Sequence, residues 1–188
     1  MDTVEISLSI LKELEGALKQ IDPARAESLV DAILSAGRVF IAGTGRSGMM
    51  MRGLAMRLMH LGFNACVVGE TITPAIQPGD LLIIGSGSGE TATLTTIARK
   101  AKSIGARVAL ITIYPESTIG KLADLVVPIK AVTTKSREDS GATSIQPGGS
   151  MFEQSLLLFC DAMVIRIIEK KGITDSNSDL MKRHANLE

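Results

Sequence analysis

An apolar strand followed by a glycine-rich loop and a helix occurs twice in this chain, and this repeated unit limits what the chain can fold into. The first apolar run, residues 39–42, leads into the loop at 43–48, and the second, residues 81–84, leads into the loop at 85–91. Glycines let a backbone turn tightly and approach a ligand closely. Free N–H groups at the following helix start favour an anion, and Ser and Thr hydroxyls add hydrogen bonds. The pattern predicts a phosphorylated small molecule bound at the carboxyl edge of a parallel sheet.

Strand and helix patterns alternate along most of the chain, which predicts the α/β class. We expect a three-layer α/β/α sandwich of flavodoxin or Rossmann type, with a five-stranded parallel sheet covered on both faces. The predicted strands are 38–42, 64–68, 81–84, 107–113 and 125–129. The predicted helices are 3–21, 23–36, 49–61, 91–103, 118–123 and 151–171.

The length of 188 residues fits a single domain with a sizeable core. We expect leading helices over 1–37, the α/β core over 38–171 and a polar tail over 172–188 that could fray unless a partner subunit holds it. Residues 130–150 form a polar stretch that interrupts the alternation, and a loop this long is usually functional or disordered.

Charge and hydropathy exclude two kinds of partner. Lys and Arg number 20, as do Asp and Glu, so the chain lacks the basic excess that nucleic-acid binding requires. No apolar run reaches the roughly 18 residues of a membrane span. The first residues lack the positive region of a signal peptide, so we expect a soluble, cytoplasmic protein.

The residues that usually bind metals are scarce. The chain has 2 Cys and 2 His, and Cys66 and Cys160 lie in apolar stretches typical of buried, reduced thiols. We therefore expect neither a metal site nor a bound cofactor.

A nicotinamide enzyme is the main rival hypothesis from spacing alone. Residues 43–48 match the dinucleotide fingerprint Gly-x-Gly-x-x-Gly, and Glu70 follows the second strand, where an acid would meet a ribose hydroxyl. Three features weaken this hypothesis: a second loop of the same chemistry, two helices before the first strand, and no obvious catalytic domain after it.

The candidate phosphate ligands also have simpler explanations. Ser86, Ser88 and Thr91 could be ordinary turn and cap residues, since Ser and Thr favour helix starts, although their density after an apolar strand favours phosphate binding. Ser47 has a similar position in the first loop. Arg46 is either a surface charge or a group that approaches the anion.

Each candidate catalytic residue likewise has an alternative role. Glu153 is placed to act as a general base beside a polar loop, but residues 150–153 also fit the Ser-x-x-Glu capping box. His60 lies near a predicted helix end, where the helix dipole favours a cation. His184 lies in the polar tail, where it could simply be solvated.

Taken together, residues 43–47 and 85–91 resemble the sugar isomerase (SIS) domain. Residues 146–154 narrow this resemblance to the 6-phospho-3-hexuloisomerase family, and it extends over nearly the whole chain. The Ser-Gly-Ser-Gly-Glu-Thr loop is specific to SIS domains. The sequence departs from the family at Gly148, where a bulkier apolar residue is expected, but Glu153 stays in register.

The resemblance implies isomerisation of D-arabino-3-hexulose 6-phosphate to D-fructose 6-phosphate through a cis-enediol(ate), without metal or redox cofactor. It implies that Glu153 is the proton acceptor, with His184, and secondarily His60, as proton-transfer partners. The implied substrate-binding residues are Gly45, Arg46, Ser47, Ser86, Gly87, Ser88, Gly89, Glu90 and Thr91.

The family habit further implies a homotetramer with active sites near subunit interfaces. It also implies 3-hexulose-6-phosphate synthase as the functional partner, in the ribulose monophosphate pathway of formaldehyde fixation or pentose phosphate supply. Two alternatives stay open: an SIS isomerase of another sugar phosphate, such as arabinose 5-phosphate, and a non-catalytic sugar-phosphate sensor.

Overall fold

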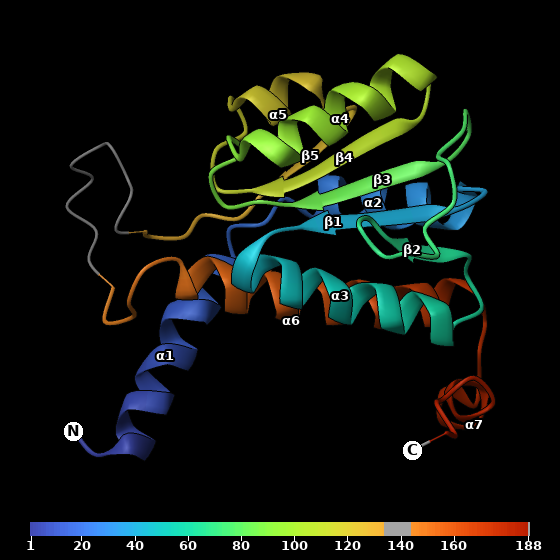
Figure 1. Cartoon of the computed structure of the whole chain (residues 1–188). Coiled ribbons are helices and arrows are strands. Elements are labelled where there is room, and N and C mark those ends of the chain that lie inside the picture. Colours follow the sequence, from blue (N-terminus) through green and yellow to red (C-terminus); the bar gives the residue numbers. More distant parts are fainter. Residues whose placement is uncertain (134–143, 188) are drawn as a thin grey trace.

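A computed structural model describes residues 1–133 and 144–187, so the middle of the predicted 130–150 loop lies outside the described residues. Within these residues the core is one parallel sheet of five strands, as predicted, and the strand order is β2-β1-β3-β4-β5 (Figure 1). The strands are β1 Val39–Gly43, β2 Ala65–Val67, β3 Leu81–Gly85, β4 Arg107–Thr112 and β5 Leu125–Pro128.

Helices cover both faces of the sheet, which confirms the three-layer sandwich. Helices α2 (Pro23–Ser35), α3 (Gly45–His60) and α6 (Ser150–Lys170) lie on one face, and α4 (Ala92–Ile104) and α5 (Thr118–Leu122) lie on the other (Figure 1).

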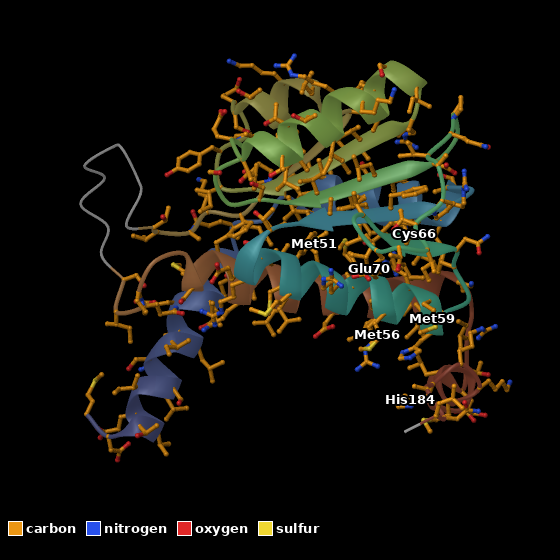
Figure 2. All side chains as sticks on the ribbon, in the orientation of Figure 1. Met51, Met56, Met59, Cys66, Glu70 and His184 are labelled. Carbon is orange, nitrogen blue, oxygen red and sulfur yellow. The ribbon has the colours of Figure 1, made fainter. Side chains whose placement is uncertain are left out.

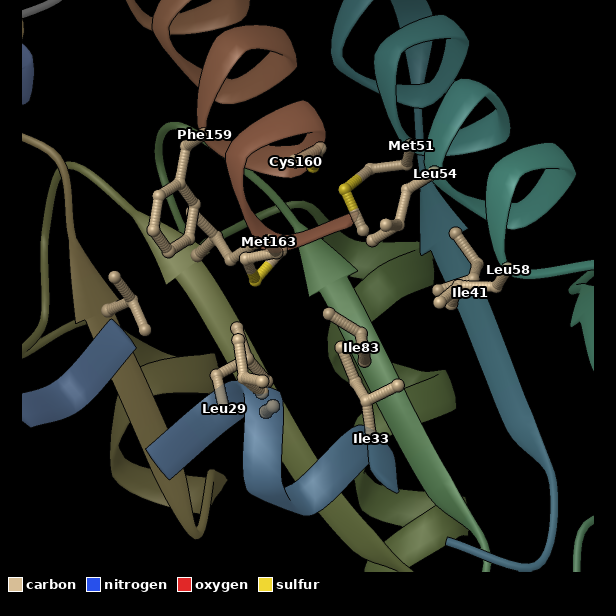
Figure 3. Packing of buried hydrophobic residues seen from close by; sticks show 14 of the residues in the cluster. Leu29, Ile33, Ile41, Met51, Leu54, Leu58, Ile83, Phe159, Cys160 and Met163 are labelled. Carbon is tan, nitrogen blue, oxygen red and sulfur yellow. The ribbon is translucent and has the colours of Figure 1, made fainter. Parts of the chain in front are cut away.

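Strands β1 to β4 contribute alternate side chains to two separate apolar cores, because successive residues of a strand face opposite sides of the sheet. In β3, Ile83 packs into the core beneath α2, α3 and α6 (Figure 3), whereas Ile84 packs against α4 and α5. Strands buried on both faces have continuous apolar sequences, which is why the sequence revealed them readily.

Only part of the apolar face of the N-terminal helix α1 (Thr3–Leu18) packs against the rest of the chain. Leu14 and Ala17 are buried, while Leu8 and Leu11 are each more than half exposed. Figure 1 shows the first turns of α1 extending away from the sandwich. The next helix, α2, begins as predicted, because the Asp22 side chain accepts a hydrogen bond from the N–H of Ala24.

The polar tail is more structured than the sequence suggested. It contains the short helix α7 (Ser176–Met181), which lies near the C-terminal end of α3 (Figure 1). Arg183, just beyond α7, donates a hydrogen bond to the carbonyl of His60 at 3.2 Å. This contact connects the tail to the sandwich within a single chain.

Candidate functional site

Two loops leave the carboxyl edge of the sheet where β1 and β3 lie side by side. Gly43 and Gly85 are paired in register at the ends of these strands. The chain then continues from β1 into α3 on one face, and from β3 through 86–91 into α4 on the other. The connections that follow these two neighbouring strands therefore run to opposite faces of the sheet. Open parallel sheets usually bind ligands at such a point.

The first loop is shorter than predicted, because α3 begins at Gly45 and not near Met49. Thr44 is extended, and Gly45 has a φ of 56°, so the chain enters the helix immediately after β1. Arg46 and Ser47 therefore lie in the first turn of a helix. The expectation of a 43–48 loop was wrong because local sequence gives little warning of a helix that begins with glycine.

Close packing explains the outer glycines of the dinucleotide-like fingerprint. A Cβ at Gly48 would lie 2.8 Å from the carbonyl oxygen of Gly43, so α3 begins directly against β1. The carboxylate of Glu70, assigned to a ribose in the rival hypothesis, forms an ion pair with Arg52 of α3. These contacts account for the motif without a nucleotide.

Two hydroxyls of the second loop stabilise its own turn. The Ser86 Oγ accepts from the N–H of Gly89 at 3.1 Å, and the Ser88 Oγ accepts from the N–H of Glu90 at 3.2 Å. This confirms the turn-residue alternative for both serines, and in accepting these bonds each hydroxyl keeps its O–H able to donate to an anion.

Thr91 and Glu90 have different surroundings. Thr91 occupies the N-cap position of α4, but its side chain makes no cap hydrogen bond, so the cap alternative is wrong for this residue. The Glu90 carboxylate accepts from the N–H of Thr118 at 2.7 Å and thereby holds the start of α5.

The start of α6 completes the site. Phe152 packs against the second loop, where a Cβ at Gly87 would lie 3.2 Å from its ring. Arg46 Nη1 donates to Ser150 Oγ at 2.7 Å and lies 3.4 Å from Glu153 Oε2. The Glu153 side chain is only 18% exposed, so this carboxylate is largely desolvated and faces a cation from the first turn of α3.

The capping-box alternative for Glu153 is wrong. The N-cap position of α6 is occupied by Gly149, without a side-chain cap, and Ser150 is already the first helical residue. The Ser150 hydroxyl instead receives the hydrogen bond from Arg46. Sequence reasoning missed this pairing because the two residues are 104 positions apart.

The two histidines meet each other and not Glu153. His60 lies at the C-terminal end of α3, about 21 Å from Arg46 along the helix at 1.5 Å per residue, and so at the opposite edge of the sheet. His184 stacks on it, with ring centroids 5.5 Å apart. Figure 2 shows His184 beside the last turn of α3.

Burial changes the acid–base character of His60. Its ring is 3% exposed, and its Nδ1 has no hydrogen-bond partner within the described part of the chain. Burial, together with the charges of Arg57 and His184, lowers the pKa of His60 below its usual range. A neutral ring is thus favoured, which contradicts the role of a cation at the helix end.

Both cysteines are free, as predicted; Cys160 is also buried as expected, whereas Cys66 is only half-buried. Among residues 1–133 and 144–187, no cluster of three His, Cys, Asp or Glu side chains is suited to a metal ion. No described helix is long and apolar enough to cross a membrane.

Comparison with known proteins gives a consistent result. The SIS domain model matches residues 32–158. A Bacillus subtilis protein named 3-hexulose-6-phosphate isomerase is 50% identical over the full length of both chains. A Mycobacterium gastri protein of the same name is 41% identical, covering 100% of this chain and 92% of that protein.

The solved structures agree. The crystal structure of a Methanococcus jannaschii protein, from which the function of a 3-hexulose-6-phosphate isomerase was inferred, has a TM-score of 0.84 and 35% identity. The match covers 98% of this chain and 99% of that one.

Proposed function

The chain belongs to the SIS domain family, and we propose that it isomerises D-arabino-3-hexulose 6-phosphate to D-fructose 6-phosphate. It is an isomerase, like the relatives that match its whole length. The observation that carries the proposed chemistry is the Glu153 carboxylate, largely buried, paired with Arg46 and adjacent to two glycine-rich loops.

The reaction moves the carbonyl from C3 to C2. Glu153 takes the proton from C2, which gives a cis-enediol(ate), and the carboxylic acid then returns the proton to C3 while the hydroxyl proton moves from O2 to O3. The Arg46 guanidinium, 3.4 Å from Glu153, is placed to stabilise the negative charge as it passes from the carboxylate to the enediolate.

The phosphate binds at the start of α4 and along the loop before it. The first N–H groups of a helix lack intrahelical partners, and the helix dipole favours an anion there. The Thr91 hydroxyl does not cap α4 and so is able to donate to a phosphate oxygen. Ser47 contributes from the first turn of α3, which follows β1. Phosphate binding thereby positions the reacting carbons.

Turnover of 3-hexulose 6-phosphate by the wild type and by Glu153→Gln tests this function. The substrate is made in place from formaldehyde and ribulose 5-phosphate by a synthase. The variant should lose roughly 10²–10⁴-fold in kcat with an unchanged Tm. Glu169→Gln, on an exposed turn of the same helix, is the matched control and should retain activity.

Two results would contradict the proposal in different ways. Full activity of Glu153→Gln would remove Glu153 from catalysis but leave the isomerase assignment. Absence of wild-type turnover would refute the hexulose substrate, and arabinose 5-phosphate would be tried next.

We further propose a homotetramer with active sites near the subunit interfaces. In support, large apolar side chains are exposed on three neighbouring helices. They are Val4, Leu8 and Leu11 on α1, Met49, Met56 and Met59 on α3, and Leu158 and Ile165 on α6. Figure 2 shows Met56 and Met59 on the side of α3 away from the sheet. Light scattering after size exclusion should give four times the 19.9 kDa chain mass.

Such an assembly offers a route for a histidine to reach Glu153 from a neighbouring subunit. His184 is exposed while His60 lies buried beneath it, so His184 is the better placed to act directly. Mixing inactive Glu153→Gln with inactive His184→Gln should restore part of the activity if each site combines residues of two subunits. Absence of recovery in verified mixed tetramers would contradict this arrangement.

The remaining proposals concern context. The proposed substrate of this isomerase is the product of 3-hexulose-6-phosphate synthase. The synthase and the isomerase therefore act in sequence in the ribulose monophosphate pathway. We place this isomerase in the cytoplasm, where its phosphorylated substrates are made.

A further inference from the structure

Glu13 of α1 accepts three hydrogen bonds from one short segment, residues 144–146. Its Oε2 accepts from Ser144 Oγ at 2.7 Å and from Gln146 Nε2 at 2.8 Å, and its Oε1 accepts from the N–H of Ile145 at 2.9 Å. Ser144 Oγ also accepts from the N–H of Gln146 at 3.0 Å. One carboxylate thus fixes both the backbone and two side chains of this segment.

The segment leads directly into the catalytic helix. A turn follows, in which the N–H of Ser150 donates to the carbonyl of Pro147 at 3.2 Å. The N–H of Glu153 then donates to the carbonyl of Gly149 at 3.0 Å. Glu153 follows Gln146 by only seven positions, so a displacement of one moves the other.

The chemistry of this contact requires an ionised acid. All three partners are donors, and a carboxylate is the side chain that accepts from all of them. Burial by itself would raise the pKa of Glu13, but the bonds from Gln146, Ile145 and Ser144 outweigh it and lower that pKa. Gln146 is only 7% exposed, so loss of its acceptor would leave a buried donor unpaired, which is costly.

The first turn of α6 is therefore held at two points. Arg46 holds it from the first turn of α3 through Ser150 and Glu153, and Glu13 holds the approach to it from α1. Active-site groups must be kept close to their productive geometry by such supporting contacts.

We propose that Glu13 is a positioning residue of the isomerase, which through residues 144–146 sets where Glu153 stands relative to the substrate carbons. This inference rests on the proposed function. A misplacement of about 1 Å can cost 10²-fold in rate, whereas phosphate binding depends on a different loop.

Three variants test the proposal. Glu13→Gln places an amide N–H₂ against the donors and should lower kcat about 10- to 100-fold with KM nearly unchanged. Adding Gln146→Glu to it exchanges acceptor and donor across the contact and should recover most of kcat. Glu15→Gln is the matched control, because Glu15 lies on the same helix and pairs with Lys19 at the surface; it should behave as wild type.

Hydrogen exchange of the Ile145 amide gives a readout without activity. Exchange should be faster in Glu13→Gln than in Glu15→Gln, and slow again in the double variant. If the wild type is active and Glu13→Gln has the same kcat as Glu15→Gln, the positioning role of Glu13 is refuted while the proposed function stands. A fall in kcat that the double variant does not recover, with Ile145 exchange restored, would also overturn it. An inactive wild type would instead refute the proposed function.

Discussion

Alanine substitutions at two glycines provide the sharpest test of how the second loop is built. Gly89 and Gly45 both have positive φ, 61° and 56°, but their surroundings differ. A Cβ at Gly89 would lie 2.0 Å from Ser117 Oγ and 2.6 Å from Ser117 Cβ, whereas a Cβ at Gly45 meets nothing within 4 Å. Gly45→Ala therefore measures backbone strain alone, and Gly89→Ala measures strain plus a clash.

The expected magnitudes follow from these contacts. Alanine in the left-handed region costs about 1–2 kcal/mol, and overpacking against Ser117 adds about 1–3 kcal/mol. An unfolding entropy near 2.1 cal/mol/K per residue gives about 0.4 kcal/mol/K for this length, so Tm should fall by about 5–13 °C in Gly89→Ala and about 3–5 °C in Gly45→Ala.

The assay is thermal unfolding at one protein concentration, because self-association shifts apparent stability, followed by steady-state kinetics. Gly89→Ala should also raise KM, since Gly89 donates to Ser86 within the loop proposed to bind the phosphate. Equal Tm values for the two variants would show that Ser117 does not pack against Gly89 as described.

Three further predictions concern charge and reactivity. Arg46→Gln should lower kcat/KM by roughly 10- to 100-fold, the value of a hydrogen bond to a charged group. The free energy of unfolding should change by less than about 1 kcal/mol, because the pair is partly exposed. Steady-state kinetics and thermal unfolding together check this. Burial raises the pKa of the Cys160 thiol, so iodoacetamide followed by mass spectrometry should find Cys66 labelled first and Cys160 labelled only after unfolding. The pKa of His60 is lowered from its ordinary 6.5, so between about pH 6.5 and the folded-state pKa the unfolded chain binds more protons than the folded chain. The free energy of unfolding should therefore fall as pH drops through this range. Denaturation of wild type and His60→Gln should show this loss only in the wild type.

The fold was predictable because its signals are local. Five short apolar runs separated by helical patterns gave the parallel sheet, and Asp22 with Pro23 gave the start of α2. The two helix starts at the site were harder. Gly45 resembles a loop residue, and Ser150 with Glu153 resembles a capping box, yet tertiary contacts decided both cases.

The contacts that build the site join residues more than a hundred positions apart. Arg46 and Ser150 belong to different helices, and Glu13 reaches residues 131 to 133 positions further along the chain. No periodicity or motif in a single sequence encodes such pairs. The residue types at the site were therefore predictable, but not their partners.

The placement of Glu153 illustrates why these distant partners matter. A lone carboxylate at a helix start is well solvated and free to move, whereas Glu153 is largely buried and lies 3.4 Å from Arg46, so it is directed toward one position. Here the cation comes from α3 and the support beneath the helix comes from α1, so three separate parts of the chain determine where this carboxylate lies. Loss of Arg46 should change the charge that Glu153 faces, and loss of Glu13 should change where Glu153 stands. The two variants are therefore expected to respond differently to a second change: only Glu13→Gln should regain kcat when Gln146→Glu is added, because that change restores the support and not the charge.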